Sequence, residues 1–313
     1  MPDTIGKLVR LKYLGLRWTY LETIPSSIGK LRNLQNLDME HTYIRTLPKS
    51  IWKLQKLRHL YINEIYRTKI EHHPRGNSLQ NLETLQGAFV GKDSPLIDCL
   101  YRLINLRKLK VVIQLSLSQQ EALAEGLVKL THLKTLKLKS IDELGHAQDL
   151  KLMRLSGLKK LSSLYLFGKL EKPSNITTIN VLPQNLVDLT LSASRLSDDP
   201  MPELKKLHKL KSLSFYSDSY TGKIMVCSIG GFPQLLILKF WMLPELEEWT
   251  VEEQALPSLK RLEIRSCRRL RVLAGLRHLK SLRELKLKDI PMETKEKIWK
   301  DIAHSPAIII DMK

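Results

Sequence analysis

Leu259-Lys260-Arg261-Leu262-Glu263-Ile264 sets the fold, because its Leu-x-x-Leu-x-apolar pattern recurs along the whole chain. Twelve copies follow one another at steps of 23 to 28 residues. Their first leucines are Leu11, Leu34, Leu57, Leu82, Leu106, Leu133, Leu161, Leu186, Leu210, Leu235, Leu259 and Leu282. The sixth place of each copy is apolar except at Gly87. Twelve copies in phase at this interval indicate a repeat architecture.

The spacing within one copy predicts a short strand. The residues at places four and six lie two apart, so they share one face, and places three, five and seven share the other. One repeat cannot bury its apolar face alone, so neighbouring repeats stack. We therefore expect an α/β solenoid, a leucine-rich-repeat horseshoe with a parallel sheet on its concave face and short helical or irregular returns on its convex face. Residues 1–313 would form a single domain of about twelve repeats.

The returns between strands carry their own signals. Pro25 and Pro48 predict bends, because proline fixes φ and has no N–H to donate. One short helical or irregular turn is expected after each bend, at Ser26–Leu31 and Lys49–Leu54. The ninth places are polar in some repeats and apolar in others, which predicts no regular asparagine ladder at that place.

Three segments depart from the regular repeat. Glu64–Ser78 is polar and charged, and we expect it to loop out. Ala303–Met312 is expected to add a terminal strand through Ile308-Ile309-Ile310. Met1–Leu8 matches the back half of a repeat, so we expect a chain truncated at its N-terminus, with an intact protein capped by this half-repeat as the alternative.

Composition excludes several classes of protein. Lys and Arg total 51 against 32 Asp and Glu, which gives a formal charge of +19 over 313 residues. Cys99, Cys227 and Cys267 are too few and too separated for a disulfide-rich scaffold or a local metal site. No apolar run approaches the roughly 20 residues of a membrane span. We expect a cytoplasmic protein, with nuclear or peripheral membrane association left open.

Several phrases resemble the leucine-rich-repeat region of plant intracellular disease-resistance proteins, in the class with coiled-coil, nucleotide-binding and leucine-rich-repeat parts. They are Ile24–Gln35, Leu47–Leu54, Gly231–Leu235, Leu246–Trp249, Leu256–Cys267 and Glu296–Ala307. The resemblance covers only the repeat region of that class. It implies a module that recognises a pathogen effector or a guarded host protein. It also implies intramolecular contact with a nucleotide-binding domain that this chain lacks.

No motif points to an enzyme or a cofactor. None of the five Gly-Lys pairs has the earlier glycine and following Ser or Thr that a phosphate-binding loop requires. The tandem pair His72-His73 lacks further metal ligands at a fixed spacing, and Cys267 follows a strand, where a buried thiol is expected. We therefore predict no catalytic residue, no cofactor and no metal.

The predicted binding surface is the outward face of the sheet. Tyr13, Tyr61, Tyr165, Phe167, Tyr216 and Trp241 occupy six of its 36 positions, about 17%, whereas aromatic residues make up 6% of the chain. Exposed aromatic side chains at this density favour a protein-binding surface, where such residues act as anchors. The alternative is that neighbouring side chains or loops cover several of them.

Basic side chains complete this surface. Lys108, Lys110, Lys137 and Lys139 fill four of six outward places on two adjacent strands, with no acid among those six. Arg261 and Arg265 are further candidates for partner contact. The lysines could meet an acidic surface of a partner protein or of the missing nucleotide-binding domain. A solvated patch without a partner is the alternative.

The leading hypothesis is a recognition module of plant immunity that binds a protein partner. The alternative is a leucine-rich-repeat scaffold or adaptor with no immune role. The charge of +19 suggests a third hypothesis, binding to nucleic acid or an anionic membrane. We rank it low, because basic residues lie on both faces and no groove-reading motif is present.

Overall fold

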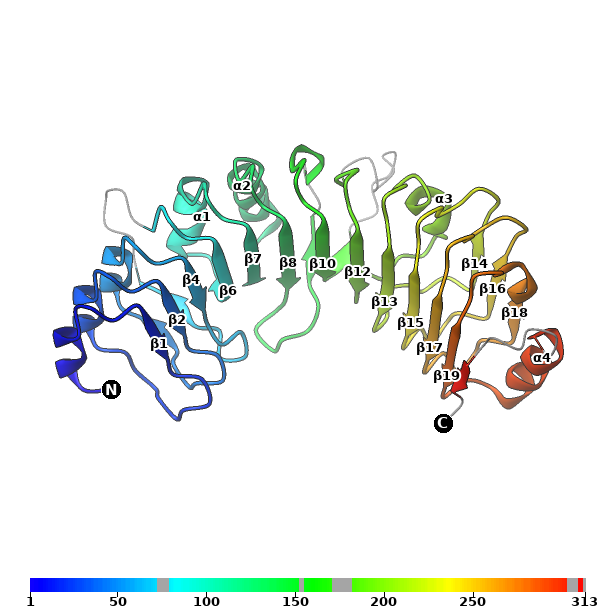
Figure 1. Cartoon of the computed structure of the whole chain (residues 1–313), viewed down its shortest axis with the longest axis horizontal. Coiled ribbons are helices and arrows are strands. Elements are labelled where there is room, and N and C mark those ends of the chain that lie inside the picture. The colour runs from blue at the N-terminus through cyan, green and yellow to red at the C-terminus, as the bar shows by residue number, and fades with distance from the viewer. Residues whose placement is uncertain (72–78, 152–154, 171–181, 303–308, 312–313) are drawn as a thin grey trace. The chain divides into compact units, whose positions relative to one another are not determined.

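The computed structural model describes residues 1–71, 79–151, 155–170, 182–302 and 309–311. The chain divides into two compact units, Met1–Leu161 and Ser162–Lys313. Both are built from the same repeat, a strand followed by a return segment (Figure 1). Whether the two form one domain stays a prediction.

The first unit has a parallel sheet in the order β1-β2-β4-β6-β7-β8. Its strands are β1 Tyr13–Gly15, β2 Asn36–Asp38, β4 His59–Tyr61, β6 Thr84–Val90, β7 Lys108–Ile113 and β8 Thr135–Ser140. Short strands β3 Thr46–Leu47, β5 Lys69–Ile70 and β9 Asp149–Leu150 lie in the returns. The helices are α1 Pro95–Cys99 and α2 Leu117–Val128, with 3-10 helices at Asp3–Lys7, Ser26–Lys30, Lys49–Lys53, Leu100–Arg102 and Leu155–Gly157.

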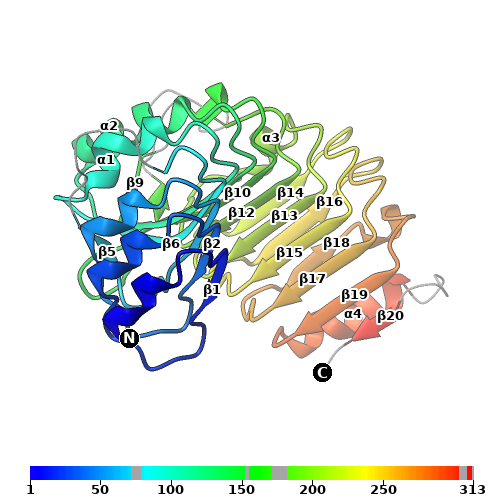
Figure 2. The same cartoon turned by 60° about the vertical axis from the view of Figure 1, so that its left-hand side comes forward.

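The second unit has two parallel sheets, which Figure 2 shows as two sets of strands. The longer sheet comprises β10 Ser163–Phe167, β12 Asp188–Ser192, β13 Ser212–Tyr216, β15 Ile237–Trp241, β17 Arg261–Arg265, β19 Glu284–Lys288 and β20 Ile309–Asp311. The shorter sheet comprises β14 Ile224–Cys227, β16 Glu248–Val251 and β18 Val272–Ala274. The remaining elements are β11 Lys169–Leu170, α3 Met201–Leu204, a 3-10 helix at Leu276–His278 and α4 Met292–Ile302.

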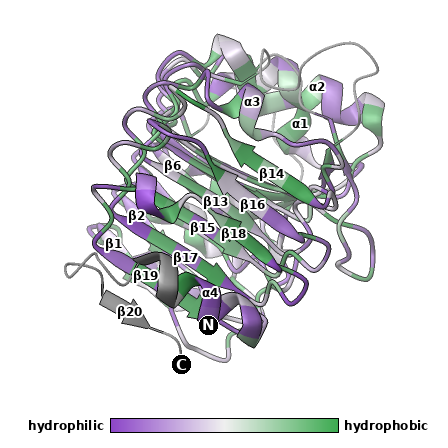
Figure 3. Cartoon of the chain, turned by 90° about the vertical axis from the view of Figure 1, so that its right-hand side faces the viewer, coloured by the Kyte–Doolittle hydropathy of each residue, from purple (hydrophilic) through white to green (hydrophobic). Residues whose placement is uncertain are grey.

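The repeat leucines form the core of each unit. Corresponding places pair across neighbouring strands, for example Leu85 with Leu109 and Leu213 with Leu238. From the second repeat on, every leucine at places one and four is at most 4% exposed. Inward and outward places alternate along each strand, and Figure 3 accordingly shows both hydrophobic and hydrophilic residues in the strands. These observations confirm the predicted leucine-rich-repeat solenoid with a parallel sheet and short returns.

The prolines act as predicted. Pro25 and Pro48 have φ of −70° and −66°, and a 3-10 helix of five residues begins directly after each. Successive helices pack closely, since a Cβ added to Gly29 would lie 2.7 Å from the carbonyl oxygen of Ser50. Glycine therefore permits the close approach of one return to the next.

Gly87 is an extra residue in its strand rather than an exception in the core pattern. The register between β6 and β7 shifts between Gln86 and Ala88, so that Ala88 pairs with Val111 and is fully buried. Gly87 has φ of +84°, the left-handed conformation of a β-bulge residue. The sixth place of this repeat therefore belongs to Ala88.

A polar ladder lies at a place that the sequence pattern did not single out, directly before the first leucine of a repeat. The side chains there donate hydrogen bonds to main-chain carbonyls of the preceding repeat. The pairs are Asn33 to Val9, Asn81 to Gln55, Asn105 to Gln80, Ser258 to Pro233 and Ser281 to Pro257, at 2.7–2.9 Å. These bonds satisfy carbonyl groups where the chain enters each strand.

Two of the irregular segments, Glu64–Ser78 and Ala303–Met312, have different outcomes. The expectation that Glu64–Ser78 loops out is wrong for its middle part, because Thr68 is fully buried and Lys69–Ile70 pairs with Thr46–Leu47. Residues 72–78, including His72 and His73, lie outside the described residues. The terminal strand is confirmed as β20, which pairs with β19, although residues 303–308 lie outside the described part.

Candidate functional site

The sheet face that carries places three, five and seven brings four predicted residues of the second unit, together with the buried Ser192, into one row. Phe167, Ser192, Tyr216, Trp241 and Arg265 follow one another in register from β10 to β17. Tyr165 lies on the same face of β10, and Arg261 on that of β17. The parallel register aligns equal places, so the repeat itself builds this row.

Trp241 contacts one aromatic ring and two cations on this face. Its ring centroid lies 4.8 Å from that of Tyr216, with the two planes tilted by 32°. The guanidinium of Arg265 lies 4.8 Å from the Trp241 ring centroid, and the ammonium of Lys239 lies 5.2 Å from it. Two cations thus contact one aromatic ring, an attractive arrangement. Trp241 remains half-buried, so part of its surface stays accessible.

A buried carboxylate holds these cations in place. The Glu263 side chain is 5% exposed and lies 3.3 Å from the ammonium of Lys239, and it also pairs with Arg265. Arg261 forms an ion pair with Glu284 on the next strand. Hydrogen bonds from Lys286 and Arg261 lower the pKa of Glu284. The cations beside the aromatic row are thus oriented by acids from the sheet itself.

In the first unit, the structure brings together the predicted lysine cluster, Lys108, Lys110, Lys137 and Lys139. In the register of β7 and β8, Lys108 pairs with Thr135 and Lys110 with Lys137. The carboxylate of Glu64 lies 3.2 Å from Lys137 and 3.3 Å from Lys139. The sequence analysis found no acid at the six outward places, and Glu64 reaches the cluster from the loop after β4. The net charge of the cluster is therefore lower than expected.

Tyr13 and Tyr61 occupy outward places on β1 and β4 of the first unit. The side chain of Tyr13 is 59% exposed. Tyr61 is half-buried, and its ring is nearly parallel to that of His59 at a centroid distance of 6.4 Å. The alternative that neighbours cover part of the predicted aromatic set thus holds for Tyr61.

The structure also shows an exposed aromatic cluster that the sequence analysis missed. Trp18 stacks on His41 at 3.8 Å, and Tyr43 lies 5.8 Å from Tyr20 and 5.0 Å from Tyr66 between ring centroids. Trp18 and His41 both stand at place eight of their repeats, and the three tyrosines stand at place ten. Comparing equal places beyond the strand would have revealed this cluster.

Place eight adopts a left-handed turn in many repeats. Seven non-glycine residues at this place have positive φ, namely Trp18, His41, Ala193, Ser217, Met242, Ser266 and Asp289. This conformation is uncommon for residues with a side chain. It ends the strand and turns the side chain outward, and Trp18 is 72% exposed.

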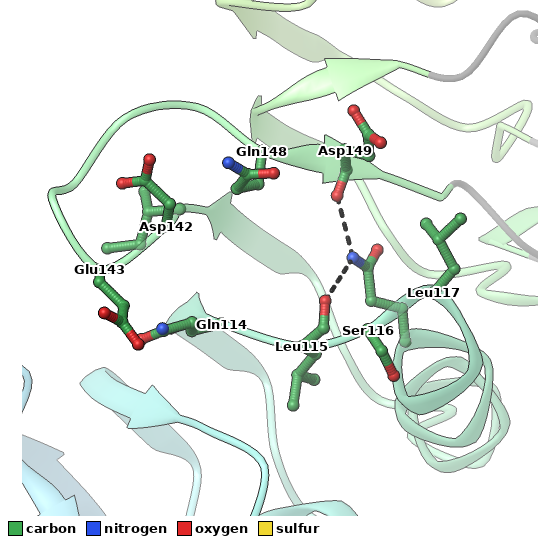
Figure 4. Close-up of a pocket in the computed structure, with 10 residues that line it drawn as sticks. Gln114, Leu115, Ser116, Leu117, Asp142, Glu143, Gln148 and Asp149 are labelled. Carbon is green, nitrogen blue, oxygen red and sulfur yellow. Dashed lines mark hydrogen bonds between the residues drawn. The ribbon is translucent and has the colours of Figure 1, made fainter.

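A cavity of about 390 Å³ lies between the loop after β8 and the start of α2 (Figure 4). Asp142 and Glu143 line one side, opposite Ser116 and Leu117. The side-chain amide of Gln120 donates to the carbonyl oxygens of Leu115 and Asp149, which fixes the wall of the cavity. In the described part of the chain, no three His, Cys, Asp or Glu side chains are placed to hold a metal ion.

None of the helices among the described residues is both long and apolar enough to traverse a membrane.

All three cysteines are buried, and burial raises the pKa of Cys267 to about 12. This confirms the expected buried thiol.

Solved structures share the fold. An internalin from Listeria monocytogenes is 18% identical, with a TM-score of 0.53 covering 98% of this chain and 84% of that one. The leucine-rich repeat domain of APL1B is 14% identical, with a TM-score of 0.57 covering 100% and 98%. At these identities the likeness concerns the fold alone.

Sequence comparison is more specific. The family of the leucine-rich repeat region matches residues 2–304. The Arabidopsis thaliana disease resistance proteins RPP8 and RPH8A are 35% and 34% identical over 95% of this chain. The chain spans 32% of the length of each of these relatives. The chain therefore belongs to the leucine-rich repeat family, in the form found in plant disease resistance proteins.

Proposed function

We propose that this chain is the recognition module of a plant immune receptor and binds a protein partner through the exposed face of its sheet. The observation that carries this proposal is Trp241, a partly accessible aromatic ring between Tyr216 and two oriented cations. Aromatic and arginine side chains dominate the energy of protein interfaces. The similarity to disease resistance proteins supports the immune context.

The partner would be a pathogen effector or a host protein that a pathogen modifies. In an intact receptor the same module would also contact a nucleotide-binding domain and regulate its switching. Both roles are protein recognition, so neither requires a catalytic residue or a cofactor in this chain. The receptor would act in the cytoplasm.

The test compares two double variants in capture experiments from infected and uninfected plant tissue, quantified by mass spectrometry. Tyr216→Ala with Trp241→Ala removes the aromatic pair. Ile224→Ala with Ile229→Ala removes two exposed apolar side chains, 52% and 58% exposed, one on β14 and one just after it. We expect a partner retained by wild type and by the isoleucine variant, but reduced tenfold or more by the aromatic variant.

The outcome also separates the alternatives. If the aromatic variant retains the same proteins as wild type, the sheet-face proposal is wrong. The aromatic variant could instead lose only host proteins that wild type captures equally from infected and uninfected tissue. In that case the chain is a scaffold or adaptor without an immune role.

A further inference from the structure

A short loop of the first unit carries an acid to the lysine cluster. Glu64–Arg67 lies between two buried residues, Asn63 at 6% exposure and Thr68 at 0%. The Asn63 side chain donates to the carbonyl oxygen of Thr42 at 2.8 Å, and the Thr68 hydroxyl donates to that of Ile44 at 2.6 Å. Both ends of the loop are therefore anchored in the preceding repeat.

The far side of the loop is anchored as well. Arg67 donates to the carbonyl oxygen of Asp142, just after β8, at 2.9 Å. Its guanidinium also lies 5.9 Å from the ring centroid of Phe89 on β6. Phe89 and Val112 stand at outward places, yet they are only 5% and 2% exposed. The loop thus holds its position over the ends of β6 to β8.

This anchoring places Glu64 as the internal counter-ion of half the lysine cluster. It contacts Lys137 and Lys139 at 3.2 and 3.3 Å. By contrast, no ion pair joins Lys108 or Lys110 to any residue in the described part of the chain. Four cations and one carboxylate leave a local charge of about +3. Partial burial and the charges of Lys108 and Lys137 lower the pKa of Lys110.

We propose that the lysine cluster is the receptor for an acidic segment of the partner protein, and that Glu64 competes with that segment as a built-in carboxylate. The proposal rests on the proposed function and names the chemistry of the partner. An incoming carboxylate pairs with Lys108 and Lys110, which form no ion pair with Glu64. A second one displaces Glu64 from Lys137 and Lys139. The charge of the cluster favours this occupant, because an acid relieves repulsion among the lysines.

The test measures binding of a fluorescent twelve-residue peptide of alternating Asp and Glu by anisotropy, with the full chain at 150 mM salt. Glu64→Gln keeps the size of the side chain but removes its charge. We expect it to tighten binding three- to tenfold. Lys108→Met with Lys110→Met should weaken binding at least tenfold. Lys30→Met with Lys53→Met, on the returns, is the charge-matched control and should change binding less than twofold.

Three results would overturn the proposal: Glu64→Gln leaves affinity unchanged or weakens it, the return lysines matter as much as the cluster, or random duplex DNA competes as well as the peptide. Thermal melts of each variant establish that it is folded, and Glu64→Ala gives a second charge-free variant. If the peptide test fails while loss of Trp241 still abolishes partner capture, only this inference fails. If both fail, the proposed function fails too.

Discussion

Gly87 illustrates how one residue adapts a strand to a repeat of different length. Its φ of +84° disfavours any residue with a side chain, and a Cβ at this position would lie 1.9 Å from the carbonyl oxygen of Ile62. The bulge keeps Ala88 in the core and directs the chain beyond it. The backbone strain and the clash both raise the free energy of the folded state, so a substitution of Gly87 should destabilise the protein.

We expect Gly87→Ala to lower the free energy of unfolding by about 2–4 kcal/mol, because strain and a backbone clash add. Urea denaturation followed by circular dichroism measures this change. Gly126→Ala in α2 is the control, since the added Cβ would lie 3.6 Å from the Cβ of Leu100, an ordinary van der Waals contact. It should be neutral or stabilising by up to about 1 kcal/mol. Equal effects of the two variants would contradict the bulge interpretation.

The three cysteines allow a second residue-scale prediction. Burial raises the pKa of Cys99, Cys227 and Cys267 to about 12. At pH 8 the native protein should therefore react with a thiol reagent far more slowly than the urea-unfolded chain, in which all three react. A fast-reacting thiol in the native protein would show that one of them is accessible.

The sign of the accompanying pH effect follows from the direction of these shifts. The native state holds the thiol protons more tightly than the unfolded chain, whose thiols lose theirs near pH 8.5. The thiol contribution to stability is complete below that pH. It is lost as pH rises toward 12, so cysteine-to-alanine variants should lose less stability than wild type between pH 8 and 10.5.

At the scale of elements, α2 is the longest helix of the first unit and forms the return of the fifth repeat. Ser116 and Gln119 form a capping box at its start, each side chain bonded to the backbone of the other. Its buried face includes Leu123 and Leu127, and Gln120 reaches the carbonyl oxygen of Asp149. Capping and packing together stabilise an α-helix in this return, whereas the returns at Ser26–Lys30 and Lys49–Lys53 form 3-10 helices.

We expect Ser116→Ala to destabilise the protein by about 1 kcal/mol, because an N–H group at the helix start loses its partner. Chemical denaturation checks the value. Glu125→Ala, at an exposed position of α2 away from the cap, is the control and should change stability by less than about 0.5 kcal/mol. A neutral Ser116→Ala would mean that water replaces the cap without cost.

At the scale of the whole molecule, the charge of +19 is distributed rather than focused. Many basic side chains of the sheet face are paired, as Arg17 is with Asp38 and Lys239 with Glu263. Lys30 and Lys53 lie on the returns. Such a surface attracts polyanions through net charge without reading their sequence.

We therefore expect random duplex DNA to bind only at low salt. Its affinity should fall at least about 100-fold between 50 and 200 mM salt, because counterion release drives such binding. Fluorescence anisotropy with two unrelated duplexes measures this slope. Preference for one duplex over the other would instead support the nucleic-acid hypothesis, whereas salt-insensitive or absent binding would remove it.

The neighbours of a candidate-site residue could be predicted from the sequence where they occupy equal or nearby places in adjacent repeats. Other contacts could not be predicted in this way. Tyr216, Trp241 and Arg265 share a place in successive repeats, so counting residues puts them side by side. Their contacts with Lys239 and Glu263 follow from the same register. The aromatic cluster of Trp18 and Tyr43 was missed because the left-handed turn at place eight is a backbone conformation that strand periodicity does not contain.

The leucine spacing alone determined the solenoid, the parallel sheet and the outward places. A period of about 24 residues fixes which side chains share a face, whatever lies between the strands. Only the tertiary structure decided that Gly87 is a bulge and that Glu64 meets Lys137, 73 residues further along the chain. Such contacts depend on the path of a loop across stacked repeats. That path is set by buried anchors such as Asn63 and Thr68, whose burial no local pattern specifies.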